Sequence, residues 1–98
     1  MNKYEMMFIV KSNSDDSKIQ ATAENLKNVI TTMNGEITDS KDLGNKELAY
    51  PIKKQTTGYY FVVDFNGTTE LVAELDRKAR IDESILRHLI IRLDEEEK

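Results

Sequence analysis

The chain has 98 residues, enough for one domain with a modest hydrophobic core. It contains no cysteine, which excludes a disulfide framework, a thiolate metal site and a cysteine nucleophile, and it has no run of the roughly 18 apolar residues that a membrane span needs. The formal net charge is −4. Residues 94–98, with four carboxylates and one lysine, carry −3 of it, so residues 1–93 hold only −1. Residues 1–93 therefore lack the strongly basic surface of a protein that binds nucleic acid without a partner.

The first third of the chain predicts a strand followed by a helix. Residues 3–10 alternate as a strand, with apolar side chains on both of its faces. Residues 12–17 form a turn that offers several helix N-caps, and Asn34-Gly35 supply a left-handed stop at the end of the helix. The helix between them carries one apolar stripe, which consists of Ile19, Ala23, Leu26, Ile30 and Met33.

The middle of the chain predicts a hairpin. Residues 36–40 begin a second strand, which turn and bulge residues at 41–46 interrupt and which resumes over residues 47–52. Pro51 cannot donate a ladder hydrogen bond, so we expect this strand at a sheet edge or at a bulge. A connection over residues 53–58 leads into a third strand at residues 59–65, which is apolar at nearly every position and needs cover on both faces.

The last third predicts a second helix and a fourth strand. Residues 66–69 form a turn and helix entry, the helix stripe is Leu71, Val72, Leu75 and Ala79, and residues 85–93 follow as a strand. The order β-α-β-β-α-β with right-handed crossovers predicts a ferredoxin-like α+β sandwich, with both helices on one face of a four-stranded antiparallel sheet and strands one and three at its centre. We expect residues 1–93 to form this single domain and residues 94–98 to be a disordered acidic tail.

Few residues could carry catalysis. His88 is the only histidine, and it stands in an apolar strand without a serine or aspartate at a recognised spacing. No phosphate-binding loop, dinucleotide motif or cluster of metal ligands occurs. We therefore predict no enzymatic activity, no metal or other cofactor, no small-molecule substrate and no membrane partner. The chain also enters a strand at once, without the pattern of a signal peptide, so we expect a cytoplasmic protein.

Two sets of apolar side chains lie on opposite faces of the predicted sheet. One set is Met6, Phe8, Phe61, Val63 and Ile90, and the other is Met7, Ile9, Tyr60, Val62, Leu89 and Ile91. Because the helices cover one face only, the set on the other face forms an exposed apolar patch that indicates an interface. The pattern alone leaves open which set faces out, and homodimerisation through that face is nearly as well supported as binding of another partner.

RNA binding is a further possibility that the residues raise. Gly58-Tyr59-Tyr60-Phe61-Val62 partly matches the pattern by which RRM domains stack RNA bases, but Thr57, Tyr60 and Asp64 depart from it. An RRM-like single-stranded RNA-binding module is therefore the weaker alternative. Strand four neighbours strand one in the predicted order, so Lys3, Arg87 and Arg92 could gather there as phosphate-binding groups.

Four motifs in the same order resemble the bacterial ribosomal protein S6 family. They are Lys3-Tyr4-Glu5, Leu48-Ala49-Tyr50-Pro51-Ile52, Gly58-Tyr59 and Ile85-x-Arg87. The resemblance spans residues 3–93 and implies a ferredoxin-like structural protein of the small ribosomal subunit. It further implies cooperative binding to small-subunit rRNA as a heterodimer with ribosomal protein S18.

The resemblance also implies roles for individual residues. The rRNA-binding groups would be Lys3, Tyr4, Arg87 and Arg92. The surface for the protein partner would be Leu48, Ala49, Tyr50, Pro51 and Ile52. The set that contains Met6 and Phe8 would then face the helices, together with Tyr59 and His88. Because the domain is nearly neutral, we expect it to bind rRNA weakly without its partner.

Overall fold

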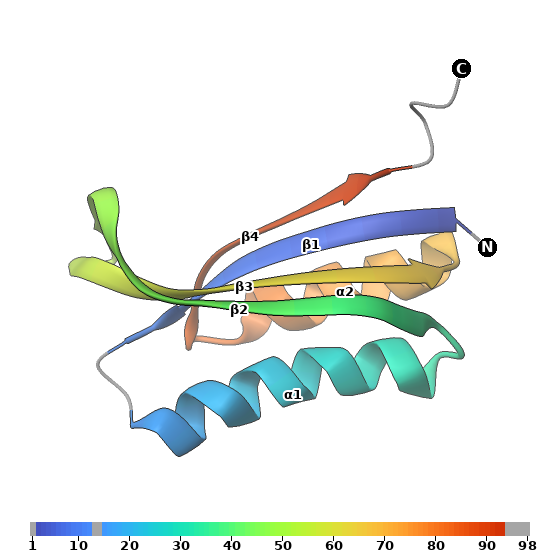
Figure 1. The fold of residues 1–98 in the computed structure, drawn as a ribbon, viewed down its shortest axis with the longest axis horizontal. Helices are drawn as coiled ribbons and strands as arrows, with labels where there is room; N and C mark the ends of the chain where they lie inside the picture. Colours follow the sequence, from blue (N-terminus) through green and yellow to red (C-terminus); the bar gives the residue numbers. More distant parts are fainter. Residues whose placement is uncertain (1, 13–14, 94–98) are drawn as a thin grey trace.

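Two helices cover one face of a four-stranded antiparallel sheet, and no helix of the described residues covers the other face (Figure 1). The structure is a computed structural model that describes residues 2–12 and 15–93. Its elements are β1 (Asn2–Lys11), α1 (Asp16–Thr32), β2 (Glu36–Ile52), β3 (Gln55–Gly67), α2 (Thr69–Ile81) and β4 (Ile85–Arg92). The strand order β2-β3-β1-β4 confirms the ferredoxin-like sandwich with β1 and β3 at its centre. The acidic tail predicted at residues 94–98 lies outside the described residues.

The hydrophobic core lies between the sheet and the helices. From the sheet it contains Met6, Phe8, Phe61, Val63 and Phe65, with Ile90 partly buried against them. The predicted stripes of the helices meet these side chains through Ile19, Ala23, Leu26, Ile30, Leu71, Leu75 and Ala79. The rings of Phe8 and Phe61 stack with their centroids 5.2 Å apart. The set that the resemblance assigned to the helix side is therefore confirmed.

The helix boundaries follow from their capping residues. The carboxylate of Asp15 accepts a hydrogen bond from the backbone N–H of Lys18 at 2.9 Å, and the hydroxyl of Thr68 accepts one from Leu71 at 3.1 Å. Asn34 adopts φ 67° at the end of α1, which satisfies the predicted left-handed stop. Neither helix in the described part of the chain is long and apolar enough to cross a membrane.

The β2–β3 hairpin differs from the prediction in two ways. Residues 41–46 do not interrupt β2, because shifts of register, one of them between Asp42 and Gly44, absorb the extra residues within a continuous strand. Gly44 adopts φ 85°, which suits glycine. The connection is also shorter than predicted: Lys53 and Lys54, both with positive φ, make the whole turn, and β3 starts at Gln55. The resulting long hairpin curls away from the helices (Figure 1).

Candidate interaction surfaces

The tip of the β2–β3 hairpin carries the predicted partner surface. Ala49, Tyr50 and Pro51 are exposed, and Tyr50 keeps 55% of its surface accessible. Pro51 lies on an edge strand, inside the register shift between Glu47 and Ile52. Its missing N–H therefore costs no ladder hydrogen bond, as predicted. We call residues 48–52 the hairpin tip.

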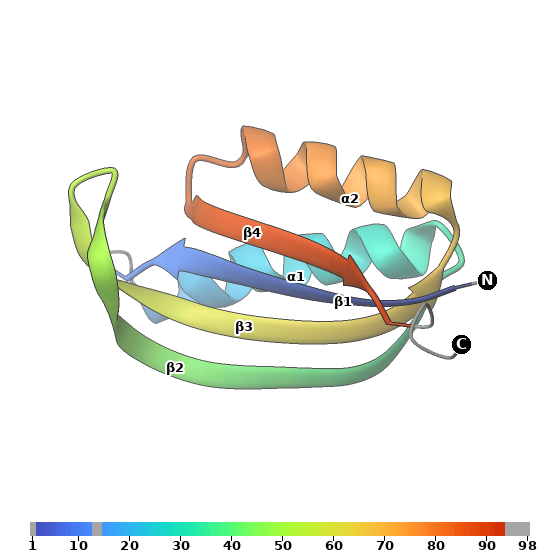
Figure 2. The same ribbon diagram turned by 90° about the horizontal axis from the view of Figure 1, so that it is seen from above.

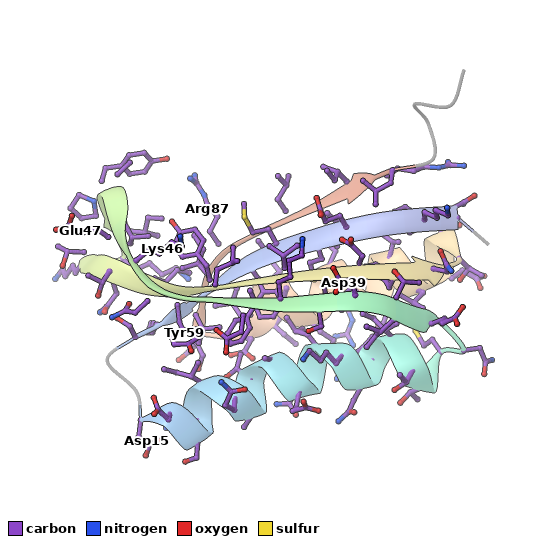
Figure 3. The ribbon with its side chains drawn as sticks, viewed as in Figure 1. Asp15, Asp39, Lys46, Glu47, Tyr59 and Arg87 are labelled. Carbon is purple, nitrogen blue, oxygen red and sulfur yellow. The ribbon has the colours of Figure 1, made fainter. Side chains whose placement is uncertain are left out.

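Arg87 lies beside the hairpin tip. Its Nη1 donates a hydrogen bond to the hydroxyl of Tyr50 at 2.8 Å, and its guanidinium carbon is 5.8 Å from the centroid of that ring. Figure 3 shows Arg87 on the side of the sheet away from the helices, beside the raised end of the β2–β3 hairpin. The arginine therefore holds an exposed aromatic ring in place through a hydrogen bond and a cation–π contact.

Lys3 and Arg92 have neighbouring backbones at the other end of β1, but the register places their side chains on opposite faces of the sheet. The guanidinium of Arg92 donates to Asn2 Oδ1 at 3.0 Å, and Asn2 Nδ2 donates to the hydroxyl of Tyr4 at 3.3 Å. The backbone of residue 93 also bonds to the carbonyl of Lys3 at 2.8 Å, which ties the end of β4 to the start of β1. We call Lys3, Tyr4 and Arg92 the basic pole.

Arg87 does not belong to the basic pole, although the sequence placed the three cations together. In the register of β1 and β4, Arg92 lies opposite Tyr4 and Arg87 lies opposite Ile9. Five residues of strand separate the two positions, about 17 Å at the usual rise per residue. Tyr4 itself is only 6% exposed and stacks on Phe65, so it can offer its hydroxyl group but not its ring face.

The sheet face away from the helices is apolar, as predicted. Met7, Leu89 and Ile91 are exposed there, and together with Leu43 and Val62 they line a hollow of about 270 Å³. We call these five side chains the open-face patch. Ile9 belongs to the same face but is only 5% exposed. The Cγ2 atom of Ile9 occupies the place that a Cβ on Gly58 would take, and the side chains of Leu48 and Leu86 lie next to that place. The curled hairpin therefore covers this end of the open face.

Three carboxylates lie side by side across the open face. Glu5 on β1 is the register partner of Asp64 on β3, which is in turn the partner of Asp39 on β2. The hydrogen bond to Asp64, then burial and then the charge of Asp64 raise the pKa of Glu5, while Lys41 opposes this shift. Asp64 Oδ1 is buried, and no described residue donates a hydrogen bond to it. We call Glu5, Asp64 and Asp39 the carboxylate row.

The raised pKa of Glu5 predicts a stability that falls as the pH rises. A carboxyl group that binds its proton more tightly in the folded state stabilises the fold below its unfolded pKa of 4.5, and this contribution is lost as the pH rises through the raised value. We expect Glu5→Gln to increase the free energy of unfolding near pH 7, by less than about 1 kcal/mol, and to have little effect near pH 4. Urea unfolding at both pH values measures this difference.

Glu24→Gln is the matched control, because Glu24 is exposed on α1 and far from the carboxylate row. We expect it to change the stability equally little at both pH values. A Glu5→Gln variant that is less stable than the parent near pH 7 would contradict the repulsion between Glu5 and Asp64. On β4 the register partner of Glu5 is Ile91, which carries no charge, so the charged neighbours are Asp64 and Lys41.

Tyr59 and Phe61 of β3 do not form an RNA-stacking surface. Phe61 is buried, and Tyr59 packs on it with ring centroids 5.1 Å apart. Figure 3 shows Tyr59 on the helix side of the sheet, where its hydroxyl donates to Asp42 at 3.2 Å. RRM domains stack bases on strand aromatics of the exposed face. The RRM-like alternative is therefore wrong for these two rings.

His88 has a carboxylate partner that the sequence did not reveal. Its Nε2 lies 2.7 Å from Asp76 Oδ1, and the contact with the half-buried imidazole and an ion pair to Arg80 lower the pKa of Asp76. Twelve residues separate the histidine from the aspartate, and only the packing of α2 beside β4 brings them together. Within residues 2–12 and 15–93, no three metal-binding side chains group around a common point.

Comparisons with known proteins agree on one family. Residues 3–92 match the family model described as ribosomal protein S6. The chain is 41% identical over 95 residues to the small ribosomal subunit protein bS6 of Alkaliphilus metalliredigens, covering 97% of this chain and 100% of that one. It is 44% identical to the protein of the same name from Clostridium acetobutylicum, covering 96% and 99%. The crystal structure of 30S ribosomal protein S6 from Thermotoga maritima superposes with a TM-score of 0.90 at 28% identity, covering 96% and 89%.

Proposed function

The chain belongs to the ribosomal protein S6 family, and from this membership we propose that it binds small-subunit rRNA cooperatively, as a heterodimer with ribosomal protein S18. As a member of this family it is a protein of the small ribosomal subunit, and thus a cytoplasmic component of the ribonucleoprotein that carries out translation. Its role is structural rather than enzymatic. The match of residues 3–92 to the family model is the observation that carries the proposal.

The rRNA-binding groups in this proposal are Lys3, Tyr4, Arg87 and Arg92. The basic pole supports it, because Lys3 is exposed and the guanidinium of Arg92 is oriented by Asn2. A guanidinium held in this way suits phosphate oxygens. Tyr4 would contribute its hydroxyl group at the pole, and Arg87 would contact RNA from the other end of β4.

The partner-binding surface in this proposal is the hairpin tip. Tyr50 supports it, because a large exposed aromatic ring held by an arginine is the kind of side chain that dominates the binding energy of protein interfaces. The charge of the domain explains why a partner is needed. Two to four basic contacts release few counterions, so rRNA binding by this chain alone should be weak.

Cooperative binding is tested by measuring rRNA affinity with and without the partner. We expect filter binding at moderate salt to detect little retention of a central-domain rRNA fragment by this chain alone, and a large gain in affinity once ribosomal protein S18 is added. The chain should also co-sediment with small subunits through high-salt sucrose. Tight binding without the partner would overturn the cooperative part of the proposal, and absence from small subunits would overturn the whole.

Substitutions of Tyr50 test the hairpin tip. We expect Tyr50→Ala to weaken pairing with ribosomal protein S18 by about 2 kcal/mol, roughly 30-fold, because the variant loses an exposed aromatic ring that the partner would bury. Tyr50→Phe keeps the ring and removes only the hydroxyl that Arg87 binds, so it should lose much less. Titration calorimetry measures both. Equal affinities for Tyr50→Ala and the parent chain would show that the partner binds elsewhere.

A further inference from the structure

Four cations flank the hairpin tip in the sequence or contact it in space. They are Lys46, Lys53, Lys54 and Arg87, which we call the cationic hairpin end. Residues 46–54 contain one carboxylate, Glu47. With it the four cations sum to +3, so the rest of residues 1–93 carries −4. The nearly neutral total of these residues therefore hides one strongly positive end of the domain.

The turn of the β2–β3 hairpin carries lysine at a conformational cost. Lys53 and Lys54 adopt φ of 51° and 67°. A two-residue turn in which both φ values are positive favours Asn-Gly, because in other residues the side chain crowds the backbone in the left-handed region. Backbone strain of this kind concentrates at functional positions. The two lysines therefore point to a role beyond closing the turn.

The charges of the cationic hairpin end are available to a ligand. Its three lysines are exposed, and within residues 2–12 and 15–93 none of their side chains makes an ion pair or a hydrogen bond. Arg87 donates one N–H to the hydroxyl of Tyr50, and its guanidinium has further donors. Glu47 follows Lys46 in the strand, so its carboxylate points to the other face of β2.

The strand register places Lys46 and Arg87 on the same face of the sheet. Lys46 lies opposite Gly58 of β3, whereas Arg87 lies opposite Ile9, whose partner on β3 is Tyr60. Gly58 and Tyr60 are two residues apart, which puts them on one face of their strand. The hairpin curls toward this face, away from the helices (Figure 1). The turn lysines are therefore carried to the side of the sheet on which Arg87 lies.

The position of the lysines favours phosphate groups over a protein ligand. Residues 48–52 are apolar or aromatic, like the core of a protein interface, and the lysines precede and follow them. Charged groups at the rim of such an interface stay accessible after pairing. Exposed cations next to bound RNA neutralise its phosphates and release counterions, which adds to the affinity.

We propose that the cationic hairpin end is a further rRNA-binding site, which contacts phosphate groups when the protein partner holds the hairpin tip. The assignment rests on the proposed function and adds Lys46, Lys53 and Lys54 to its RNA contacts. In the free chain, the charge of −4 on the rest of residues 1–93 opposes RNA at this end. In the heterodimer, one hairpin binds the partner through its tip and RNA through the lysines, which couples the two interactions.

Replacement of the lysine turn by Asn-Gly tests this site. Lys53→Asn/Lys54→Gly removes two charges and supplies the residues that the turn favours. We expect the variant to unfold at a higher urea concentration than the parent chain and to pair equally well with ribosomal protein S18. Its heterodimer should bind the rRNA fragment roughly tenfold more weakly at about 0.1 M salt, with a slope of log affinity against log salt concentration that is shallower by about 2. Urea unfolding, calorimetry and filter binding measure these effects.

Two control variants separate charge at the turn from overall charge. Lys53→Arg/Lys54→Arg keeps both charges and should keep the affinity for rRNA. Lys18→Gln/Lys27→Gln on α1 makes the same change in net charge as the Asn-Gly variant and should leave the salt slope nearly unchanged.

The outcomes distinguish this site from the proposed function. Equal affinity and equal salt slope for the parent and the Asn-Gly heterodimers would overturn the site and leave the proposed function standing. Weaker pairing of the Asn-Gly variant with ribosomal protein S18 in the absence of RNA would also overturn it, because the lysines would then serve the protein partner. A parent heterodimer that does not retain the rRNA fragment would overturn the proposed function and this site together.

Discussion

Replacement of Phe8 by alanine is expected to lower the free energy of unfolding by about 3–5 kcal/mol. Phe8 is 0% exposed and stacks on Phe61 in the middle of the two central strands. The substitution removes a whole ring from a site enclosed by the sheet and both helices, where the backbone of paired strands cannot collapse to refill the space. Urea unfolding followed by circular dichroism measures the loss.

Met7→Ala is the matched control for this prediction. Met7 is the neighbour of Phe8 on the same strand, but it points to the open face and is 36% exposed. We expect its truncation to cost less than about 1 kcal/mol. Because the loss of Phe8 could exceed the stability of a small domain, Phe8→Leu provides a milder variant that should still be clearly less stable than Met7→Ala. Equal losses at positions 7 and 8 would contradict the assignment of the two faces.

Neutralisation of the basic pole is expected to produce the second large effect. The double variant Lys3→Gln/Arg92→Gln, assembled with ribosomal protein S18, should bind the rRNA fragment roughly 10- to 100-fold more weakly at about 0.1 M salt. The slope of log affinity against log salt concentration should become shallower by about 2, one unit for each lost phosphate contact. Filter binding at several salt concentrations measures both quantities.

Lys18→Gln/Lys27→Gln is the control for the pole. These lysines lie on α1, on the other side of the sheet from the open face, and their replacement makes the same change in net charge. We expect it to leave the salt slope nearly unchanged. If both double variants altered the slope equally, the affinity would depend on the overall charge rather than on the position of Lys3 and Arg92.

The four labelled strands and two helices illustrate what the sequence determined by itself. The period of apolar residues distinguishes strands from helices locally, and the order of the elements, with right-handed crossovers, leaves one arrangement of the sheet. In the view from above, β1 and β3 run side by side between β4 and β2 (Figure 2). The stripe of α1 was therefore sufficient to predict the α1 residues of the core.

The alternation of apolar residues along the strands does not reveal which of the two apolar faces of the sheet the helices cover. Met6 and Met7 are the same residue type, and the resemblance to a family was needed to assign them before the structure was known. The turn at Lys53 and Lys54 was also hidden, because lysine is not a residue typical of positive φ. Local composition carries no signal for such positions.

The contacts between distant residues were decided only by the tertiary structure. Arg87 meets Tyr50 because the hairpin curls over the sheet, and it is separated from Arg92 by the register of β4 on β1. Likewise, Glu5, Asp64 and Asp39 form a row because three strands pair in one particular register. A shift of one residue would turn each of these side chains to the other face. Strand pairing thus converts a known fold into specific surfaces, and the residues of one strand alone cannot specify that register.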